Sequence, residues 1–365
     1  MMGFEKTRIS GVRTSRDSAT VRDTGCNILK RFNRDGVVHL KGVLTDAELD
    51  GLRASVAAQV AGRHESTTAY DFEDLARQVW DGVEEFDTGG AERFDMSLLS
   101  EILALDNAKR PIRDGVENAD AEPGMFFYDA AGWRTQDGIR QAALSSALPS
   151  ICGSLLDTTY VNFWEDTTFV KAPNTPQRTS FHQDYGYFQI EGSKCAVVWI
   201  PLDPVDKETG TMEYVRGSHL WGKAYAPNIL FAQSIHPFSP FEKLEDIEAN
   251  REDYDIISFD AEPGDVIIHH VMTIHGSRGN VSPDRMRRAM SFRYCGDDIT
   301  YLDRPGALEQ PYLEEKLSDG DPLYWSRDYP LVWTETDGLL CSRDPKAGGR
   351  ELPIYHEGPT TLVAE

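Results

Sequence analysis

The sequence predicts a mostly β protein with flanking helices, whose core is a sandwich or barrel. Between residues 157 and 298, short β-branched and aromatic runs alternate with clusters of Gly, Pro, Asn and Asp, as in sandwiches and barrels. The first half of the chain instead carries helical periodicity and a capping signal. A length of 365 residues allows two domains, but β folds often run this long as one. We therefore expect a single domain over residues 26–365.

Composition and charge restrict the class of partner. The chain has 60 acidic and 37 basic residues, a net charge of −23, which disfavours nucleic acids and anionic membrane surfaces. Its five cysteines are scattered without a C-x-x-C pair, which fits a reducing compartment. The sequence carries neither a secretory leader pattern nor an apolar run of membrane-spanning length. We expect a cytoplasmic protein with a small-molecule substrate, and the oligomeric state is not specified.

The N-terminal part begins without periodicity and then becomes regular. Residues 1–25 are polar, so we expect a mobile arm. Residues 32–36 form a turn-rich stretch, and the apolar run 37–40 that follows predicts a strand. Thr45 and Glu48 have the spacing of a capping box, and Gly62 is a stop signal. Apolar residues recur between them at helical spacing: Leu49, Leu52, Val56 and Val60.

A helical covering region is expected over residues 45–156. Short helical patterns at 72–80 and 96–107 are separated by Gly- and Asp-rich breaks, and no clear sheet pattern occurs between 63 and 135. A further helix is predicted at 141–156.

The core is expected over residues 157–298. The predicted strands are 158–171, 179–190, 195–201, 211–216, 265–275 and 287–294. Residues 299–365 are rich in Pro and Asp with scattered aromatic residues, so we expect a tail that wraps the core.

A His-x-Asp pair lies on the second of these strands. Alternate strand residues share a face, so His182 and Asp184 can converge on one metal ion while Gln183 points away. Taken alone this pattern is weak, because a histidine is more often a structural residue.

His275, at the end of the fifth predicted strand, can complete a triad of two histidines and one carboxylate. This arrangement suits non-haem Fe(II) with open coordination positions. A structural zinc site would usually recruit thiolates, and none is near in the sequence. His269 and His270 compete for this role but are not preferred, since His270 is five residues from His275 and faces the other side of a regular strand.

The last core strand is rich in arginine. A planar guanidinium can hold one carboxylate of a dicarboxylate whose other end chelates iron. Arg287 shares its face with Ala289 and Ser291, which leaves room for a ligand, and is preferred. Arg285 and Arg288 remain alternatives.

In their order, these motifs resemble the phytanoyl-CoA dioxygenase family of Fe(II)/2-oxoglutarate oxygenases. Roughly two-thirds of the chain is covered, through the segments 32–60, 181–184, 199–203, 210–219 and 264–277 and through Arg287. Arg216 stands where the family usually has Pro, and Thr209-Gly210 replaces Asn-Gly. Both differences lie in turns.

The resemblance implies a double-stranded β-helix (jelly-roll) core with His182, Asp184 and His275 as iron ligands. It also implies 2-oxoglutarate binding by Arg287, with Ser277 and Trp199 at positions that often contact this cosubstrate. The implied reaction uses O2, releases succinate and CO2 and hydroxylates a carbon of a small organic metabolite. Tyr185, Tyr187 and Lys171 are candidates for lining the substrate pocket.

Two alternatives remain. A catalytically silent jelly-roll binding protein would be expected to lose a ligand or the arginine, and all are present. A cupin-like metalloenzyme that does not use 2-oxoglutarate generally draws more histidines from its first motif. The fold and the triad do not select a substrate.

Overall fold

The computed structural model describes residues 25–66, 68–71, 124–228, 239–305, 307 and 310–335. It confirms a mostly antiparallel β fold with flanking helices, arranged as a double-stranded β-helix. The expected arm, except for residue 25, and the predicted helices at 72–80 and 96–107 lie outside the described residues.

Two sheets form the core. The larger has the order β1-β10-β7-β12-β4-β3-β2, with β14 also paired to β4, and the smaller has the order β5-β11-β8-β9. The larger sheet contains β1 (Val37–Leu40), β2 (Tyr70–Asp71), β3 (Phe126–Ala130), β4 (Tyr160–Lys171), β7 (Cys195–Pro201), β10 (Val266–His270), β12 (Arg287–Cys295) and β14 (Leu331–Thr334). The smaller contains β5 (Thr179–His182), β8 (Met212–Val215), β9 (Ile256–Ser258) and β11 (His275–Ser277). A two-stranded ribbon pairs β6 (Ile190–Glu191) with β13 (Thr300–Tyr301).

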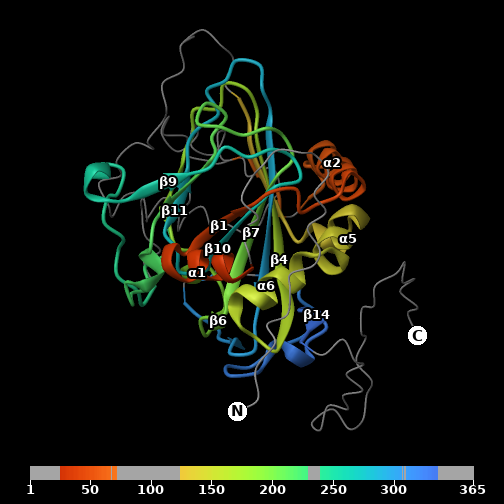
Figure 1. Cartoon of the computed structure of the whole chain (residues 1–365). Helices are drawn as coiled ribbons and strands as arrows, with labels where there is room; N and C mark the ends of the chain where they lie inside the picture. The colour runs from red at the N-terminus through yellow and green to blue at the C-terminus, as the bar shows by residue number, and fades with distance from the viewer. Residues whose placement is uncertain are drawn as a thin grey trace, which may run out of the picture.

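The helices cover one side of the larger sheet. They are α1 (Gly25–Asp35), α2 (Asp46–Ala61), α5 (Asp137–Ser145) and α6 (Leu148–Leu156). In Figure 1 the smaller sheet lies to the left, the larger sheet in the middle, and α2 and α5 to the right. α2 has the predicted bounds, because the side chains of Thr45 and Glu48 each accept a hydrogen bond from the other's backbone N–H.

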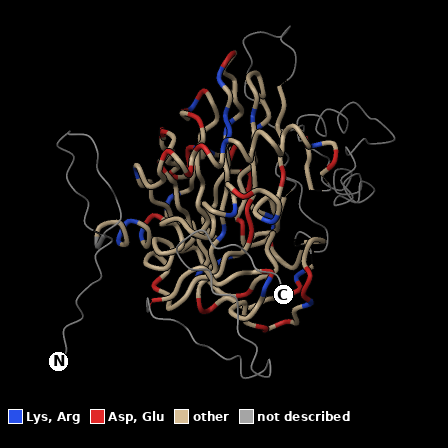
Figure 2. The backbone as a smooth tube through the Cα atoms, turned by 90° about the vertical axis from the view of Figure 1, so that its right-hand side faces the viewer, with Lys and Arg blue, Asp and Glu red and all other residues tan. Residues whose placement is uncertain are grey.

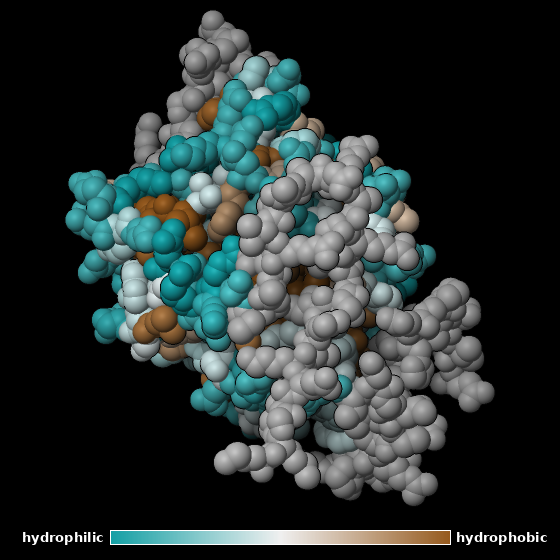
Figure 3. Space-filling view, viewed as in Figure 1, coloured by the Kyte–Doolittle hydropathy of each residue, from teal (hydrophilic) through white to brown (hydrophobic). Residues whose placement is uncertain are grey.

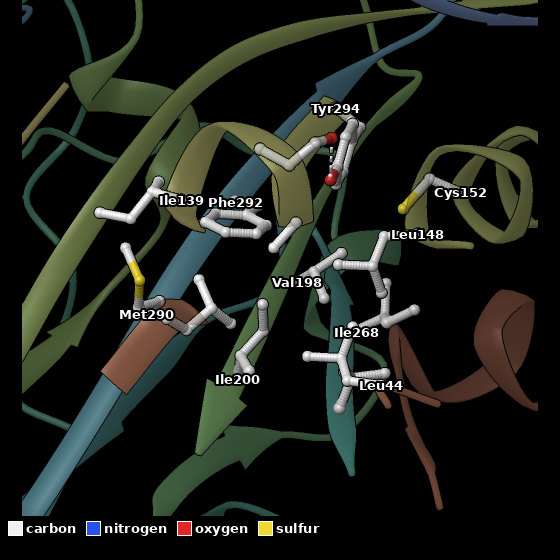
Figure 4. Packing of buried hydrophobic residues seen from close by; sticks show 14 of the residues in the cluster. Leu44, Ile139, Leu148, Cys152, Val198, Ile200, Ile268, Met290, Phe292 and Tyr294 are labelled. Atoms are coloured by element: carbon white, nitrogen blue, oxygen red, sulfur yellow. Dashed lines mark hydrogen bonds between the residues drawn. The ribbon is translucent and has the colours of Figure 1, made fainter. Parts of the chain in front are cut away.

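Residue alternation assigns the two faces of the larger sheet. On β12, Met290, Phe292 and Tyr294 belong to the apolar cluster that includes the helices, whereas Arg287 and Arg293 line a pocket on the opposite face. Figure 4 shows Phe292, Val198 and Ile268 packed with Ile139 and Leu148. The hydroxyl of Tyr294 donates to the carbonyl of Ala143 at 2.8 Å, which fixes α5 to the sheet. The inward face is thereby left to the polar side chains between the sheets.

Three predictions about helices and the covering region were wrong. The predicted helix at 141–156 is two helices, α5 and α6, with a break at residues 146–147. Residues 32–35, expected in a turn, close α1. The covering region also supplies β2 and β3 to the larger sheet. All five residues of β3 are buried, so the strand lacks the polar and apolar alternation that would identify it.

Two predicted strands were also too long. β5 ends at His182, and Asp184 opens a 3-10 turn, Asp184–Tyr187, closed by the Phe188 N–H on the Tyr185 carbonyl at 3.4 Å. The predicted strand 265–275 is β10 and β11 in different sheets. The Thr273 N–H donates to the His270 carbonyl at 2.8 Å in the turn between them. Within the described part of the predicted tail, β14 pairs with the start of β4.

The surface carries both signs of charge. Acidic and basic positions are interspersed along the tube in Figure 2. Where described residues are visible in Figure 3, that face is largely hydrophilic with small apolar patches. No helix within the described ranges is long and apolar enough to cross a membrane.

Candidate metal centre

The smaller sheet and the turn after β5 bring His182, Asp184 and His275 together. His182 and His275 are register partners on β5 and β11, and their ring centroids are 4.3 Å apart. The Nε2 atoms of His182 and His275 lie 3.5 and 3.8 Å from Asp184 Oδ1. One ligand atom of each residue lies within 4.8 Å of the others, and all three residues are buried. Residues separated by 91 positions (275 − 184) in sequence therefore form one cluster.

The imidazoles are oriented for metal binding. His182 Nδ1 lies 2.7 Å from the Ser180 carbonyl, and His275 Nδ1 lies 2.9 Å from the Thr273 carbonyl. A backbone carbonyl accepts only from a protonated nitrogen, so these contacts fix the proton on Nδ1 and leave Nε2 as the lone-pair donor. Two imidazole nitrogens and a carboxylate oxygen fit a divalent first-row metal such as Fe(II).

The cluster also stabilises its carboxylate in the charged form. Burial raises the pKa of Asp184, but the imidazoles of His275, His182 and His269 outweigh burial and hold this pKa well below its usual range. Burial, together with the neighbouring His269 and His182, holds the pKa of His275 well below its ordinary value. A charged carboxylate and a neutral imidazole are the protonation states in which these groups bind a metal.

His269 is a member of the site that was not preferred from the sequence. It lies on β10, is buried, and its Nε2 is 3.3 Å from Asp184 Oδ2. Its ring centroid is 4.3 Å from that of His275. The sequence held no valid signal for this placement, because β10 and β11 lie in different sheets and an offset along one strand does not relate His269 to His275. His270, in contrast, packs against His219 with ring centroids 5.3 Å apart, away from the cluster.

A pocket of about 660 Å³, counted with its open mouth, connects the cluster to the arginine strand. The pocket is lined by Tyr128, Glu165, Phe169, Thr179, His182, Asp184, Tyr187, Phe188, Trp199, Met212, His269, His275, Ser277, Arg287, Ser291 and Arg293.

Arg287 and Ser277 form a cationic region of this pocket. Arg287 is 2 % exposed, and its Nη2 donates to the Gly210 carbonyl at 3.1 Å and to Ser277 Oγ at 3.3 Å. Its Nε has no hydrogen-bond partner among the described residues. None of the carboxylates of those residues lies within ion-pair distance of the Arg287 guanidinium. Burial lowers the pKa of Arg287 to about 10, partly offset by Asp203. A buried guanidinium of this kind needs an anion.

The other two arginines are paired elsewhere. Arg285 forms ion pairs with Asp206 and Glu208, and Arg288 binds Asp203 with Nη2 at 2.6 Å from Oδ1. Neither lines the pocket.

The remaining predicted site residues are divided between the pocket and its surroundings. Trp199 lines the pocket, and its ring centroid is 5.7 Å from the Arg287 guanidinium. Tyr187 also lines it, edge-on to His182, and donates its hydroxyl proton to Asn228. Tyr185 is not a lining residue and packs against the guanidinium of Arg304. Lys171 is fully buried outside the lining, where Nζ donates to Ser277 Oγ at 3.0 Å.

The family model described as phytanoyl-CoA dioxygenase matches residues 32–289, more than half of the chain. Among curated relatives, the peroxisomal phytanoyl-CoA dioxygenase of Bos taurus is 25 % identical over 170 residues, 45 % of this chain and 49 % of that protein. The 1-deoxypentalenic acid 11-beta-hydroxylase of Streptomyces arenae is 30 % identical over 142 residues, 36 % of this chain and 47 % of that protein. The chain thus spans about half the length of these relatives.

Solved structures share the fold at low sequence identity. The epimerase SnoN in complex with Fe3+, alpha ketoglutarate and nogalamycin RO is 20 % identical, with a TM-score of 0.55 over 85 % of this chain and 98 % of that one. The alpha ketoglutarate dependent carbocyclase SnoK is also 20 % identical, with a TM-score of 0.54 over 84 % of this chain and 95 % of that one.

Proposed function

The chain belongs to the phytanoyl-CoA dioxygenase family, and from that premise we propose that it is an Fe(II)- and 2-oxoglutarate-dependent oxygenase. The observation that carries the proposal is the buried His182, Asp184 and His275 cluster, which shares one pocket with an arginine lacking a carboxylate partner among the described residues. A metal and a dicarboxylate are the two ligands that this pair of features complements.

His182 and His275 bind the Fe(II) through Nε2 and Asp184 through a carboxylate oxygen. Three protein ligands leave coordination positions open for other molecules. When bound, Fe(II) and 2-oxoglutarate supply the oxidising chemistry, in which O2 is consumed and succinate and CO2 are released. His269 donates a hydrogen bond from Nε2 to the second carboxylate oxygen of Asp184 and so orients this ligand.

Arg287 binds the distal carboxylate of 2-oxoglutarate, assisted by the Ser277 hydroxyl and by the packing of Trp199. The Ser277 hydroxyl donates to Thr179 Oγ1 at 3.0 Å and accepts from Lys171, which holds it in place beside Arg287. Because the guanidinium and the hydroxyl are buried, a carboxylate there forms charge-assisted bonds with little competition from water.

The substrate is a small organic metabolite, hydroxylated at a carbon that the pocket places beside the metal. Tyr187 forms part of the wall next to His182. The single-domain organisation over residues 26–365 and the cytoplasmic location stay predictions. Free Cys152, Cys195 and Cys295 support a reducing compartment.

An anaerobic titration tests the proposal. The metal-free protein receives Fe(II) and then 2-oxoglutarate, and a weak visible charge-transfer band is expected to grow to saturation. Arg287→Gln should keep Fe(II) binding and weaken 2-oxoglutarate binding by about tenfold or more, since a charge-assisted bond is lost. Arg216→Gln, at a surface ion pair with Asp255, is the matched control.

Other outcomes have distinct meanings. A folded protein that binds Fe(II) but gives no band would favour a cupin-like enzyme that does not use 2-oxoglutarate. Failure to bind Fe(II) would favour a catalytically silent binding protein. Normal 2-oxoglutarate affinity in Arg287→Gln would assign the carboxylate to another cation.

A further inference from the structure

A second arginine faces the pocket from the same strand as Arg287. Arg293 lies six residues further along β12, on the same face as Ser291, and only 7 % of it is exposed. Six residues span about 20 Å of strand, so the two arginines enter different parts of the pocket. Arg293 and His269 both pair with Val197, on opposite sides of β7, which places Arg293 in the same cross-strand row as His269.

One side of the Arg293 guanidinium forms hydrogen bonds with the protein, and the other side does not. Nη1 donates to Thr167 Oγ1 and to the Ser291 carbonyl, while Nε and Nη2 have no hydrogen-bond partner in the described part of the chain. The guanidinium carbon also lies 5.5 Å from the ring centroid of Phe188, a lining residue. These contacts fix the side chain and leave Nε and Nη2 available.

Arg288 shows how the Nε and Nη2 atoms of a guanidinium bind a carboxylate. Its Nε donates to Asp203 Oδ2 at 2.9 Å and its Nη2 to Asp203 Oδ1 at 2.6 Å, a bidentate pair. For Arg293, no carboxylate of the described residues lies within ion-pair distance. Asp166 interacts electrostatically with Arg293, but its carboxylate is bound by the backbone N–H groups of Gly132 and Trp133. A buried guanidinium without a directly paired carboxylate is costly, and a ligand carboxylate would satisfy Nε and Nη2.

Glu165 is an acidic neighbour of Arg293 in the sheet, but its carboxylate accepts hydrogen bonds from other donors. It faces Arg293 across β4 and β12 as a register partner and also lines the pocket. Its Oε1 accepts from the Tyr312 hydroxyl and, at 3.5 Å, from Gln310 Nε2. Glu165 is therefore bound by the C-terminal segment rather than paired with Arg293.

We propose that Arg293 is a substrate-binding residue that holds a carboxylate of the substrate with its Nε and Nη2 edge. The substrate class is accordingly a small carboxylic acid in its anionic form, oriented so that another part of the molecule lies at the metal centre. This inference rests on the proposed function, because it assigns the metal centre and the Arg287 region to Fe(II) and 2-oxoglutarate.

The test uses anaerobic protein saturated with Fe(II) and 2-oxoglutarate, so that Arg287 is occupied. Propionate is the probe, and propionamide is its neutral control of the same shape. Calorimetry and the charge-transfer band report binding. We expect propionate to bind at least tenfold tighter than propionamide and Arg293→Gln to lose this preference, while the dissociation constant of 2-oxoglutarate changes less than about twofold.

Matched variants separate charge from folding. Arg293→Lys keeps the charge without the planar fork and should retain only part of the preference. Glu165→Gln removes the neighbouring negative charge and should bind propionate as tightly or more tightly. Arg216→Gln should behave as the wild type. If Arg293→Gln does not fold, Arg293→Lys and Glu165→Gln still test the proposal. Weaker propionate binding in Glu165→Gln than in the wild type would contradict it.

Three further results would overturn the inference. One is equal binding of propionate and propionamide by the wild type, and another is an unchanged preference in Arg293→Gln. The third combines a tenfold loss of 2-oxoglutarate affinity in Arg293→Gln with no propionate binding to the wild type loaded with Fe(II) and 2-oxoglutarate. That result would mean that Arg293 binds a carboxylate of 2-oxoglutarate and not one of the substrate. Absence of any charge-transfer band in the wild type would instead contradict the proposed function. The metal-free protein with the same two probes would then test Arg293 separately.

Discussion

At the scale of single residues, two adjacent histidines on β10 have opposite surroundings. His269 contacts the Asp184 carboxylate, whereas His270 accepts from the Met272 N–H through Nδ1 at 3.1 Å and packs against His219. We expect His269→Ala to weaken Fe(II) binding by about 10–100-fold, as is usual when the partner of a metal ligand is removed. His270→Ala should bind Fe(II) like the wild type.

Anaerobic Fe(II) titrations of both variants measure this difference. His275→Ala provides the reference for loss of a direct ligand and should bind Fe(II) more weakly than either. Equal losses in His269→Ala and His270→Ala would contradict the role given to His269.

Asp166 is a buried carboxylate with a pH-dependent contribution to stability. Burial raises its pKa to about 7, although the N–H groups of Trp133 and Gly132 donate to it. In the unfolded chain its pKa is near 3.8. Between pH 3.8 and pH 7 the folded protein therefore keeps a proton on Asp166 that the unfolded chain has lost. The stability from Asp166 is therefore complete below about pH 4 and lost as pH rises through 7, by roughly 1.4 kcal/mol per pH unit.

Urea unfolding of the wild type and Asp166→Asn at pH 5 and pH 8 tests this sign. Because Asn does not titrate, the free energy of unfolding of the wild type relative to the variant should be larger at pH 5. A difference that is the same at both pH values would show that Asp166 is charged in the folded protein throughout this range.

At the scale of elements, α2 and α5 cross at two glycines. A Cβ built on Gly138 would lie 2.5 Å from the Gly51 carbonyl carbon and 2.7 Å from Ser55 Oγ. A Cβ on Gly51 would meet only the Gly138 Cα, at 3.4 Å. Both Gly→Ala changes gain helix propensity, but only Gly138→Ala forces the helices apart, which we expect to cost about 1–3 kcal/mol.

Thermal and urea unfolding of Gly138→Ala and Gly51→Ala check this asymmetry. Gly51→Ala should be close to neutral or slightly stabilising. Equal stability of the two variants would mean that the helix crossing adjusts without cost.

The sequence predicted well those elements whose bounds are set by residues within or next to the element. The capping box defines the start of α2, and β7 has the predicted bounds because its apolar run is closed by turn residues. The chain turn between β10 and β11 could not be predicted, because a hydrogen bond from Thr273 Oγ1 to the distant Gly36 carbonyl supports it. The strand parity used to compare His270 with His275 therefore does not apply, since these residues lie in different sheets.

At the scale of the whole molecule, the metal centre couples parts of the chain that are distant in sequence. The cluster contains residues from β5, the turn after it and β11, and the unfolded chain does not hold them together. A ligand that binds only the folded state stabilises it, by about 2.7 kcal/mol at a free concentration of 100 times Kd. We expect anaerobic Fe(II) to raise the Tm and His275→Ala to abolish this increase.

Differential scanning fluorimetry with and without Fe(II) measures the effect. An equal increase of Tm in the wild type and in His275→Ala would indicate Fe(II) binding elsewhere on this acidic chain.

The sequence indicated which residues to consider for the site but not all of their neighbours. The triad and Arg287 were recognisable because their motifs combine residue type with spacing, and the structure brings them into one pocket. Arg293 and Glu165 have no such motif. Their placement depends on the register between β12 and β4, a pairing set by the whole sheet.

The two cysteines behind the pocket offer an internal measure of how often its wall opens. Cys195 and Cys295 are cross-strand partners on β7 and β12, with sulfur atoms 3.8 Å apart and no exposed surface. A thiol reagent reaches either one only after these strands separate. The rate of labelling at low reagent concentration therefore reports the free energy of local opening next to the arginine strand. Buried Cys152 on α6 reports the helical layer in the same experiment.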